Sequence, residues 1–262
     1  MIAVSPERAF VKRLAFSRDG LNAYYIEPSE ARLCGLEGEK EGYTSSPLVQ
    51  WQPDVLGNGR VTMFIAGNPG AGKTYFAKEI INMFPPNRDV LLFTALQQSD
   101  GNFAGMKRLY KIKMTPENLK MLTLENIRSM SEIPVLLFDD VDKIRDPEIK
   151  KLMFALMDDA LANGRGHEAH DGRGDIHVII TSHALNDYFR TKYAFENTDF
   201  VVVFPQATTK SQFERLLVNK IGIDKKKCAE LLEDGKKGLF RSVVIRKVAP
   251  MYIISGSLIE LI

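Results

Sequence analysis

The sequence has few cysteines, no long apolar run and little net charge, and each of these shortages excludes a class of protein. Two cysteines among 262 residues exclude a disulfide framework, so we expect a protein of a reducing compartment. Apolar runs are short, as in Phe200–Phe204, whereas a membrane helix needs about 20 residues, so we expect neither a signal peptide nor a membrane span. A formal net charge of +2 gives no general affinity for nucleic acid, so any DNA contact must come from a local patch.

What is present is an alternation of short β-type runs with amphipathic helical runs from about residue 60 onward. This alternation predicts an α/β fold with a mainly parallel central sheet flanked by helices. The clearest helix spans Pro147–Asn163, where apolar residues recur at helical spacing between Asp146 as N-cap and Gly164 as a stop. The expected strands, in chain order, are Val61–Ala66, Asp89–Thr94, Val135–Asp139, Ile176–Thr181 and Phe200–Phe204.

The two ends of the chain have a different pattern. We expect residues 1–58 to be an extension that packs on a core domain of residues 59–262. Within the extension, Phe10–Phe16 and Leu21–Ile26 flank a short polar turn with a glycine and predict a β-hairpin. Beyond Pro205 the pattern predicts two helices and then two β-type runs, Leu239–Val248 and Met251–Ser255, so the core should carry extra C-terminal strands.

One segment has the composition of a phosphate-binding loop. Residues 67–74 match G-x-x-x-x-G-K-[ST] at every position, between a β-type run and a helical run, which disfavours a chance glycine-rich turn. Glycines let backbone N–H groups surround phosphate oxygens, and the following helix directs its positive end at them. We expect Lys73 to reach the β- and γ-phosphates of ATP and the Thr74 hydroxyl to bind Mg²⁺. The predicted ATP-binding residues are Gly67, Asn68, Pro69, Gly70, Ala71, Gly72, Lys73, Thr74 and Tyr75.

Two adjacent carboxylates follow the apolar run of residues 135–138. Asp139, at the expected strand end, is predicted to hold Mg²⁺, through water. Asp140 stands where a general base would polarise the attacking water, and the alternative is that it caps a helix or a turn. Together with the phosphate-binding loop, these residues predict a Mg²⁺-dependent ATPase that forms ADP and phosphate.

The strand ending in Thr181, Ser182 and His183 should lie between the strand of the phosphate-binding loop and the strand of Asp139. One of these side chains could therefore contact the γ-phosphate or the attacking water, and we take His183 as the catalytic candidate. The alternative is that Ser182 caps a helix or that the segment is a plain turn.

A glycine-rich loop at residues 164–175 carries Arg165 and Arg173, and we expect it near the nucleotide edge of the sheet. Either arginine could act on the nucleotide of a neighbouring subunit as an arginine finger, and the alternative is a solvated connector. His167 and His170 lie in the same loop, but no further clustered ligand supports a metal site.

The segment Lys107–Lys113 interleaves basic and apolar residues. It could track a DNA backbone, or it could be an alternating strand with a solvated face.

Several short segments, together with the paired Asp139 and Asp140, resemble the poxvirus-type DNA packaging ATPases of large DNA viruses and virophages, in the FtsK–HerA superfamily. The resemblance covers roughly residues 60–262. Its nucleotide motifs are generic to P-loop ATPases, and its more particular segments are short. These segments are Thr181–His183, Asn186–Tyr188, Asp199–Gln206, Arg241–Ile245 and Pro250–Ser255.

The resemblance implies a RecA-like P-loop core with strand order 5-1-4-3-2. It also implies a homo-oligomeric ring, a pentamer or a hexamer, that translocates double-stranded viral DNA into a capsid. Viral capsid proteins would then be partners, and the protein would work in the viral factory of the host cytoplasm or in the virion.

Two other functions stay open. An AAA+ ATPase, such as a helicase loader, shares Pro69 but should carry a compact helical lid after the fifth strand, whereas this tail returns to β-type runs. A nucleotide-gated binding module would bind ATP with negligible turnover. DNA-stimulated hydrolysis would distinguish the motor from the module.

Overall fold

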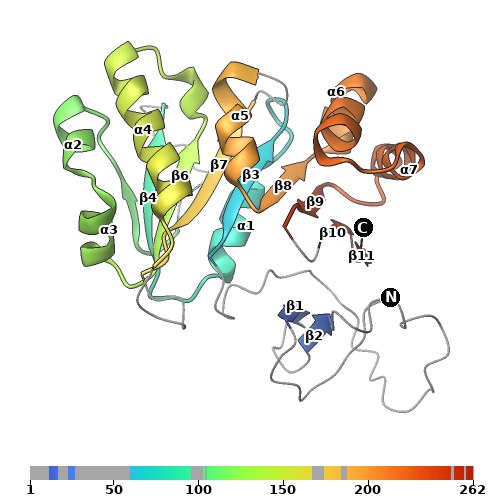
Figure 1. Cartoon of the computed structure of the whole chain (residues 1–262), viewed down its shortest axis with the longest axis horizontal. Helices are drawn as coiled ribbons and strands as arrows, with labels where there is room; N and C mark the ends of the chain where they lie inside the picture. The colour runs from blue at the N-terminus through green and yellow to red at the C-terminus, as the bar shows by residue number, and fades with distance from the viewer. Residues whose placement is uncertain are drawn as a thin grey trace.

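The structure, a computed structural model, describes residues 12–16, 23–26, 60–95, 103, 105–166, 174–183, 188–248, 251–256 and 258–261. Its central feature is a nine-stranded sheet flanked by helices (Figure 1). The strands are β3 (Thr62–Ala66), β4 (Asp89–Thr94), β5 (Leu109–Lys111), β6 (Pro134–Asp139), β7 (His177–Ser182), β8 (Phe200–Val203), β9 (Val243–Arg246), β10 (Tyr252–Ser255) and β11 (Leu258–Leu261).

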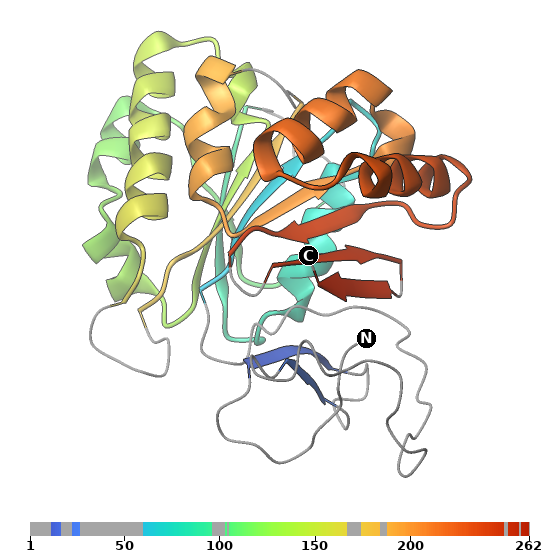
Figure 2. The same cartoon turned by 45° about the vertical axis from the view of Figure 1, so that its right-hand side comes forward.

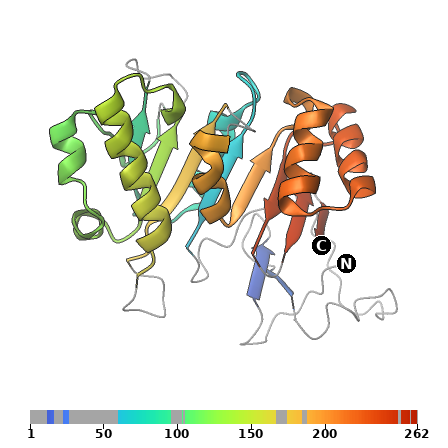
Figure 3. The ribbon, with the colours of Figure 1, turned by 45° about the horizontal axis from the view of Figure 1, so that its top comes forward.

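The strand order confirms the prediction made from the sequence. The sheet runs β11-β10-β9-β8-β3-β7-β6-β4-β5, so the five predicted strands stand in the order 5-1-4-3-2. All neighbours from β8 to β5 pair in parallel, and β7 lies between β3 and β6 (Figure 3). Strands β9, β10 and β11 continue the sheet in antiparallel pairing beyond β8, one strand more than the sequence predicted (Figure 2).

The helices cover both faces of this sheet. Helix α1 packs on one face, and the larger group from α2 to α7 packs on the other (Figures 1 and 2). The helices are α1 (Lys73–Met83), α2 (Pro116–Met121), α3 (Leu124–Met130), α4 (Pro147–Asn163), α5 (Tyr188–Asn197), α6 (Lys210–Glu214) and α7 (Lys225–Lys236), with short 3-10 turns η2 (Val141–Lys143) and η3 (Pro205–Ala207) and the π-helical η4 (Arg215–Ile221).

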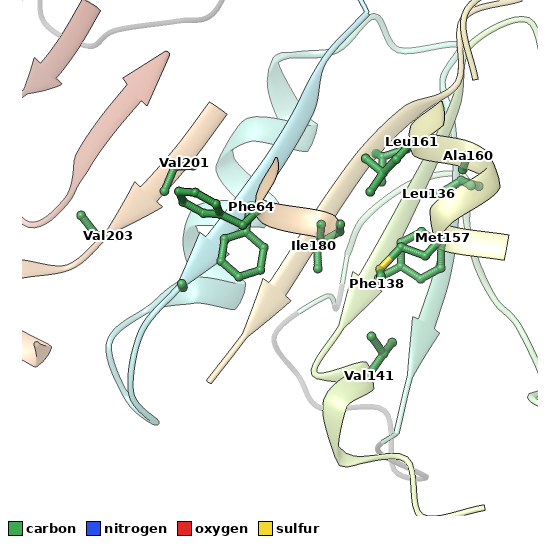
Figure 4. Packing of buried hydrophobic residues seen from close by; sticks show 14 of the residues in the cluster. Phe64, Leu136, Phe138, Val141, Met157, Ala160, Leu161, Ile180, Val201 and Val203 are labelled. Atoms are coloured by element: carbon green, nitrogen blue, oxygen red, sulfur yellow. The ribbon is translucent and has the colours of Figure 1, made fainter. Parts of the chain in front are cut away.

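Burial on both faces explains why the strands are almost continuously apolar. In β6, the four residues from Val135 to Phe138 expose none of their surface. Side chains of one strand alternate between the two cores: Phe64 joins the cluster under α2 to α7, and Met63 joins the cluster under α1. Phe138 lies in the first cluster with Met157 of α4 (Figure 4) and stacks on Phe93 with ring centroids 4.8 Å apart.

Helix α4 has the bounds that its sequence pattern predicts. The Asp146 carboxylate accepts hydrogen bonds from the backbone N–H groups of Glu148 and Ile149, and Gly164 ends the helix. Because α4 follows β6 and precedes β7, it carries the chain from the carboxyl edge of the parallel sheet back to the amino edge.

The N-terminal hairpin is also confirmed: β1 (Lys12–Phe16) pairs with β2 (Ala23–Ile26) in antiparallel orientation. The packing of residues 1–58 on the core falls outside the described residues and stays a prediction. Within the part of the chain that the structure describes, no helix is both long and apolar enough to cross a membrane.

The first residue of β7 gives a prediction about acid stability. His177 is buried, its Nδ1 accepts a hydrogen bond from the Val61 N–H at 3.1 Å, and its ring packs edge-on against Phe84. Burial, helped by the positive charge of Arg60, lowers the pKa of His177 to about 3. Below pH ~6.5 His177 is therefore protonated in the unfolded chain but neutral in the folded protein. Protonation stabilises the unfolded state, so the free energy of unfolding decreases as the pH falls.

We expect the titration of His177 alone to lower the free energy of unfolding by about 2 kcal/mol when the pH falls from 8 to 5. Urea unfolding of the wild type and of His177→Gln at both pH values measures the difference. Glutamine keeps a hydrogen-bond acceptor for the Val61 N–H but does not titrate. Between pH 8 and pH 5 the unfolding free energy of the variant should therefore fall by about 2 kcal/mol less than that of the wild type. Equal losses in the two proteins would contradict the prediction.

Candidate active site

The phosphate-binding loop of residues 67–74 joins β3 to α1 at the carboxyl edge of the sheet. Its first residue is tied to the central strand β7, because the Gly67 N–H donates to the Ser182 carbonyl at 3.1 Å. Gly70 and Gly72 have φ values of 79° and 100°, a conformation that favours glycine over other residues. Gly72 also serves as the N-cap of α1 without a side-chain cap, which leaves the first backbone N–H groups of the helix to an anion.

Lys73 is 5% exposed and lies at the centre of the site. Its Nζ donates to the Asn68 carbonyl at 3.3 Å and lies 3.0 Å from His183 Nδ1. An ammonium group can only donate, so Nδ1 accepts and the proton of the neutral imidazole sits on Nε2. From there Nε2 donates to Asp140 Oδ2 at 2.7 Å, so His183 connects the lysine of the loop to the second carboxylate.

Asp139 is the last residue of β6 and lies beside Thr74, the residue near the start of α1 that carries a hydroxyl group. Its Oδ1 accepts from Thr181 Oγ1 at 2.7 Å and lies 3.4 Å from Thr74 Oγ1. Burial raises the pKa of Asp139, while the Thr181 hydrogen bond opposes that rise and the charge of Asp140 adds to it. A buried carboxylate of this kind is stabilised by a nearby cation.

The pair of Thr74 and Asp139 fits Mg²⁺ in the way that nucleotide sites bind it. Magnesium favours one or two protein oxygens together with waters and substrate phosphates over an all-protein cage. The described residues contain no group of three or more His, Cys, Asp or Glu side chains that could hold a metal ion by themselves. Thr74 and Asp139 are therefore the residues that could hold the ion, with ATP supplying further oxygens.

Asp140 is held in a left-handed backbone conformation, with φ 51° and ψ 34°. Its N–H donates to Thr181 Oγ1 at 3.1 Å, and its Oδ2 receives both His183 and the Lys143 ammonium, the latter at 3.1 Å. Its Oδ1 is buried and has no hydrogen-bond partner among the described residues. Asp140 occupies the N-cap position of η2, but its side chain makes no cap bond there. Its role as the general base stays a prediction.

The expected position of the arginine loop is wrong. Arg165 is exposed and follows α4 at the amino edge of the sheet, opposite the phosphate-binding loop, because α4 returns the chain to the start of β7. Gly164 confirms this edge, since its carbonyl accepts from Ile176 N–H just before β7. A role for Arg165 on the nucleotide of a neighbouring subunit stays a prediction. Arg173 lies outside the described residues, as do His167 and His170.

Two cations near the site were given no contact there by the sequence analysis, although Arg241 opens one of the segments that carry the resemblance. Lys143 reaches Asp140 from η2, and Arg241 reaches the phosphate-binding loop from the segment before β9. The Arg241 guanidinium donates to the Ala71 carbonyl at 3.4 Å and lies 5.5 Å from the centre of the Tyr75 ring. No local pattern predicts this contact, because 170 residues separate Arg241 from Ala71.

Tyr75 and Arg241 also line a pocket of about 260 Å³ between α1 and strands β9 and β10. The pocket borders Gly72, where an added Cβ would clash with the Arg241 guanidinium. Its aromatic and cationic lining, beside the loop that cradles phosphates, is suited to the sugar and base of a nucleotide.

Comparison with known proteins agrees with this geometry. The family described as "ATPase family associated with various cellular activities (AAA)" matches residues 63–204, which include the loop, both carboxylates and His183. A protein of Sputnik virophage, "Uncharacterized protein V3", is 27% identical over 200 residues, which cover 74% of this chain and 74% of that protein.

Among solved structures, this chain is similar to Thermomonospora curvata EccC (ATPases 2 and 3) in complex with a signal sequence peptide. The TM-score is 0.38 at 11% sequence identity, and the alignment covers 77% of this chain and 34% of that one. The chain thus spans about a third of that protein.

Replacing the second carboxylate is expected to separate ATP binding from ATP hydrolysis. We expect Asp140→Asn to bind ATP but to slow turnover by about 10²–10⁴-fold, because the amide cannot take a proton from water. Lys73→Ala should weaken binding as well, since it removes the charge that faces the phosphates. Phosphate release and fluorescent-nucleotide titration measure the two effects, with Asp159→Asn on the exposed face of α4 as control. Wild-type turnover in Asp140→Asn would assign the base elsewhere.

We expect the Thr181 hydroxyl to support both stability and turnover, because it contacts both carboxylate-bearing residues, Asp139 and Asp140. Thr181→Val leaves the Asp140 N–H and the Asp139 Oδ1 without this partner, at a cost of about 1–3 kcal/mol in unfolding free energy. We expect a fall in kcat beyond any loss of nucleotide affinity, because both carboxylates lose their orientation. Thr181→Ser keeps the hydroxyl and should restore most of the stability and turnover. A valine variant with unchanged stability and kcat would show that the two bonds are dispensable.

Proposed function

The chain belongs to the AAA family of ATPases, and from that premise we propose that it is a Mg²⁺-dependent motor that translocates double-stranded DNA into a viral capsid. The observation that carries the ATPase part is the convergence of Lys73, His183 and Asp140, which come from three separate segments, at one edge of the sheet.

In the proposed reaction, Lys73 and the backbone N–H groups of the loop bind the β- and γ-phosphates of ATP. Mg²⁺ held by Thr74 and Asp139 would neutralise charge on these phosphates. A water oxygen attacks the γ-phosphorus, the bond from that phosphorus to the bridging oxygen of ADP breaks, and Asp140 accepts the proton of the water. His183 orients Asp140 through the 2.7 Å hydrogen bond from its Nε2.

Two observations support the packaging role over other AAA ATPases. The similar Sputnik virophage protein comes from a virus-like source, as the resemblance to viral packaging ATPases would require. The chain beyond β8 also returns to the sheet as β9, β10 and β11 after α6 and α7, whereas an AAA+ helicase loader is expected to end in a compact helical lid. Assembly as a pentameric or hexameric ring and contact with capsid proteins belong to the same proposal.

The function is tested by ATP turnover with and without double-stranded DNA, alongside the mass of the protein in solution. We expect DNA to raise turnover severalfold and nucleotide to favour a ring. Raising KCl from about 50 to about 200 mM should suppress the stimulation, because phosphate contacts release counterions. Lys73→Ala serves as the inactive control.

The other outcomes identify the alternatives. A monomer whose ATP turnover ignores DNA would reject the motor and leave an ATPase of AAA type, such as a helicase loader. ATP binding with negligible turnover under all conditions would indicate a nucleotide-gated binding module.

A further inference from the structure

A second cavity lies on the other side of the hydrolysis site from the pocket at Tyr75. It is a groove of about 720 Å³ at the carboxyl end of β4, between the segment 111–115, which starts at the last residue of β5, and the segment 143–149, which starts at the last residue of η2. Its walls carry the exposed cations Lys111, Lys113, Lys143 and Arg145, and its apolar lining includes Ala95, Ile112, Met114, Ile144 and Ile149. We call it the cationic groove.

The charge of the cationic groove is unbalanced. Among the residues that the structure describes, one carboxylate lines it, that of Asp146, and its Oδ1 already accepts two backbone N–H groups at the start of α4. Within the described part of the chain, neither Lys113 nor Arg145 makes an ion pair. A protein whose net charge is only +2 thus concentrates positive charge in one concave place. A concave cationic surface attracts and orients a polyanion.

Lys143 connects this groove to the chemistry of the site. Its ammonium lines the groove and also lies 3.1 Å from Asp140 Oδ2, and its side chain remains 47% exposed. An anion bound in the groove competes with Asp140 for this ammonium. Without Lys143, Asp140 Oδ2 would keep His183 as its partner and would have one contact fewer.

We propose that the cationic groove binds the phosphate backbone of double-stranded DNA and that a bound phosphate draws Lys143 away from Asp140, which speeds ATP hydrolysis. This inference rests on the proposed motor function and deepens it by placing the DNA contact. Of the two interpretations of Lys107–Lys113, the strand is observed, since β5 is a short edge strand paired with β4. The DNA contact belongs to the proposal, which places it on the residues at and just beyond the end of β5.

The first arm of the test measures DNA binding by fluorescence anisotropy with a labelled duplex, using the full chain. Lys113→Gln/Arg145→Gln removes two cations of the groove that make no ion pair with any described residue. Its matched control is Lys225→Gln/Lys226→Gln, two exposed lysines at the start of α7, at the opposite end of the sheet (Figure 1). We expect the groove variant to bind the duplex about 10-fold or more weakly. The negative slope of log K against log salt should become less steep by about 2.

The same groove variant should keep the ATP turnover of the wild type without DNA, since neither residue touches the hydrolysis site, and should lose most of the stimulation by DNA. Equal losses in the groove variant and its control would overturn the groove as the DNA site. If the wild type itself neither binds DNA nor responds to it, the proposed function fails. If the wild type responds and the groove variant responds equally, only the groove assignment fails.

The second arm tests the connection through Lys143. Lys143→Gln removes the ion pair to Asp140, so we expect turnover without DNA to rise toward the DNA-stimulated rate and the remaining stimulation to shrink. Lys120→Gln, which breaks an exposed ion pair with Glu148, is the control and should leave both rates unchanged. Turnover of Lys143→Gln that is unchanged or lower without DNA would overturn the connection. Unfolding curves of each variant exclude a loss of folding as the cause.

Discussion

The hydroxyl of Thr181 is the contact on which the geometry of the site depends. In the parallel register Thr181 stands opposite Asp139, so one buried hydroxyl reaches both the side chain of Asp139 and the backbone of Asp140. It is 1% exposed, and hydrogen bonds in such surroundings are stronger than in water while their loss costs more. The register of the sheet therefore positions Asp139, and through the bond to the Asp140 backbone it also fixes where the short loop after β6 begins.

The same central strand holds the other half of the site. The Ser182 carbonyl anchors the first residue of the phosphate-binding loop, and His183 lies between Lys73 and Asp140. A buried ammonium and a buried carboxylate would each be costly without a partner, and the neutral imidazole between them gives each of them one hydrogen bond. Substrate phosphates offer Lys73 a stronger partner than an imidazole does. Nucleotide binding is thus expected to change the contacts of His183 as well, and through it those of Asp140.

Local patterns predicted the parts of the structure that local physics determines. The glycine spacing of the loop, the apolar runs of the strands and the Asp146 cap each specify a conformation from neighbouring residues alone. The contacts of Arg241 could not be found in this way, because they join segments far apart in the chain. The position of Arg165 was a different kind of error. A helix of 17 residues spans about 25 Å, so the end of α4 had to lie at the far edge of the sheet.

Arg241 and Lys143 reach the site from opposite sides, and their partners differ in one physical respect. Arg241 contacts a backbone carbonyl and an aromatic ring, neither of which carries a net charge. Lys143 contacts the carboxylate that we assign as the base. An external anion can compete for either cation, but only the departure of Lys143 changes the charge around Asp140. A surface that gathers anions therefore affects hydrolysis most directly beside Lys143, and that is where the cationic groove lies.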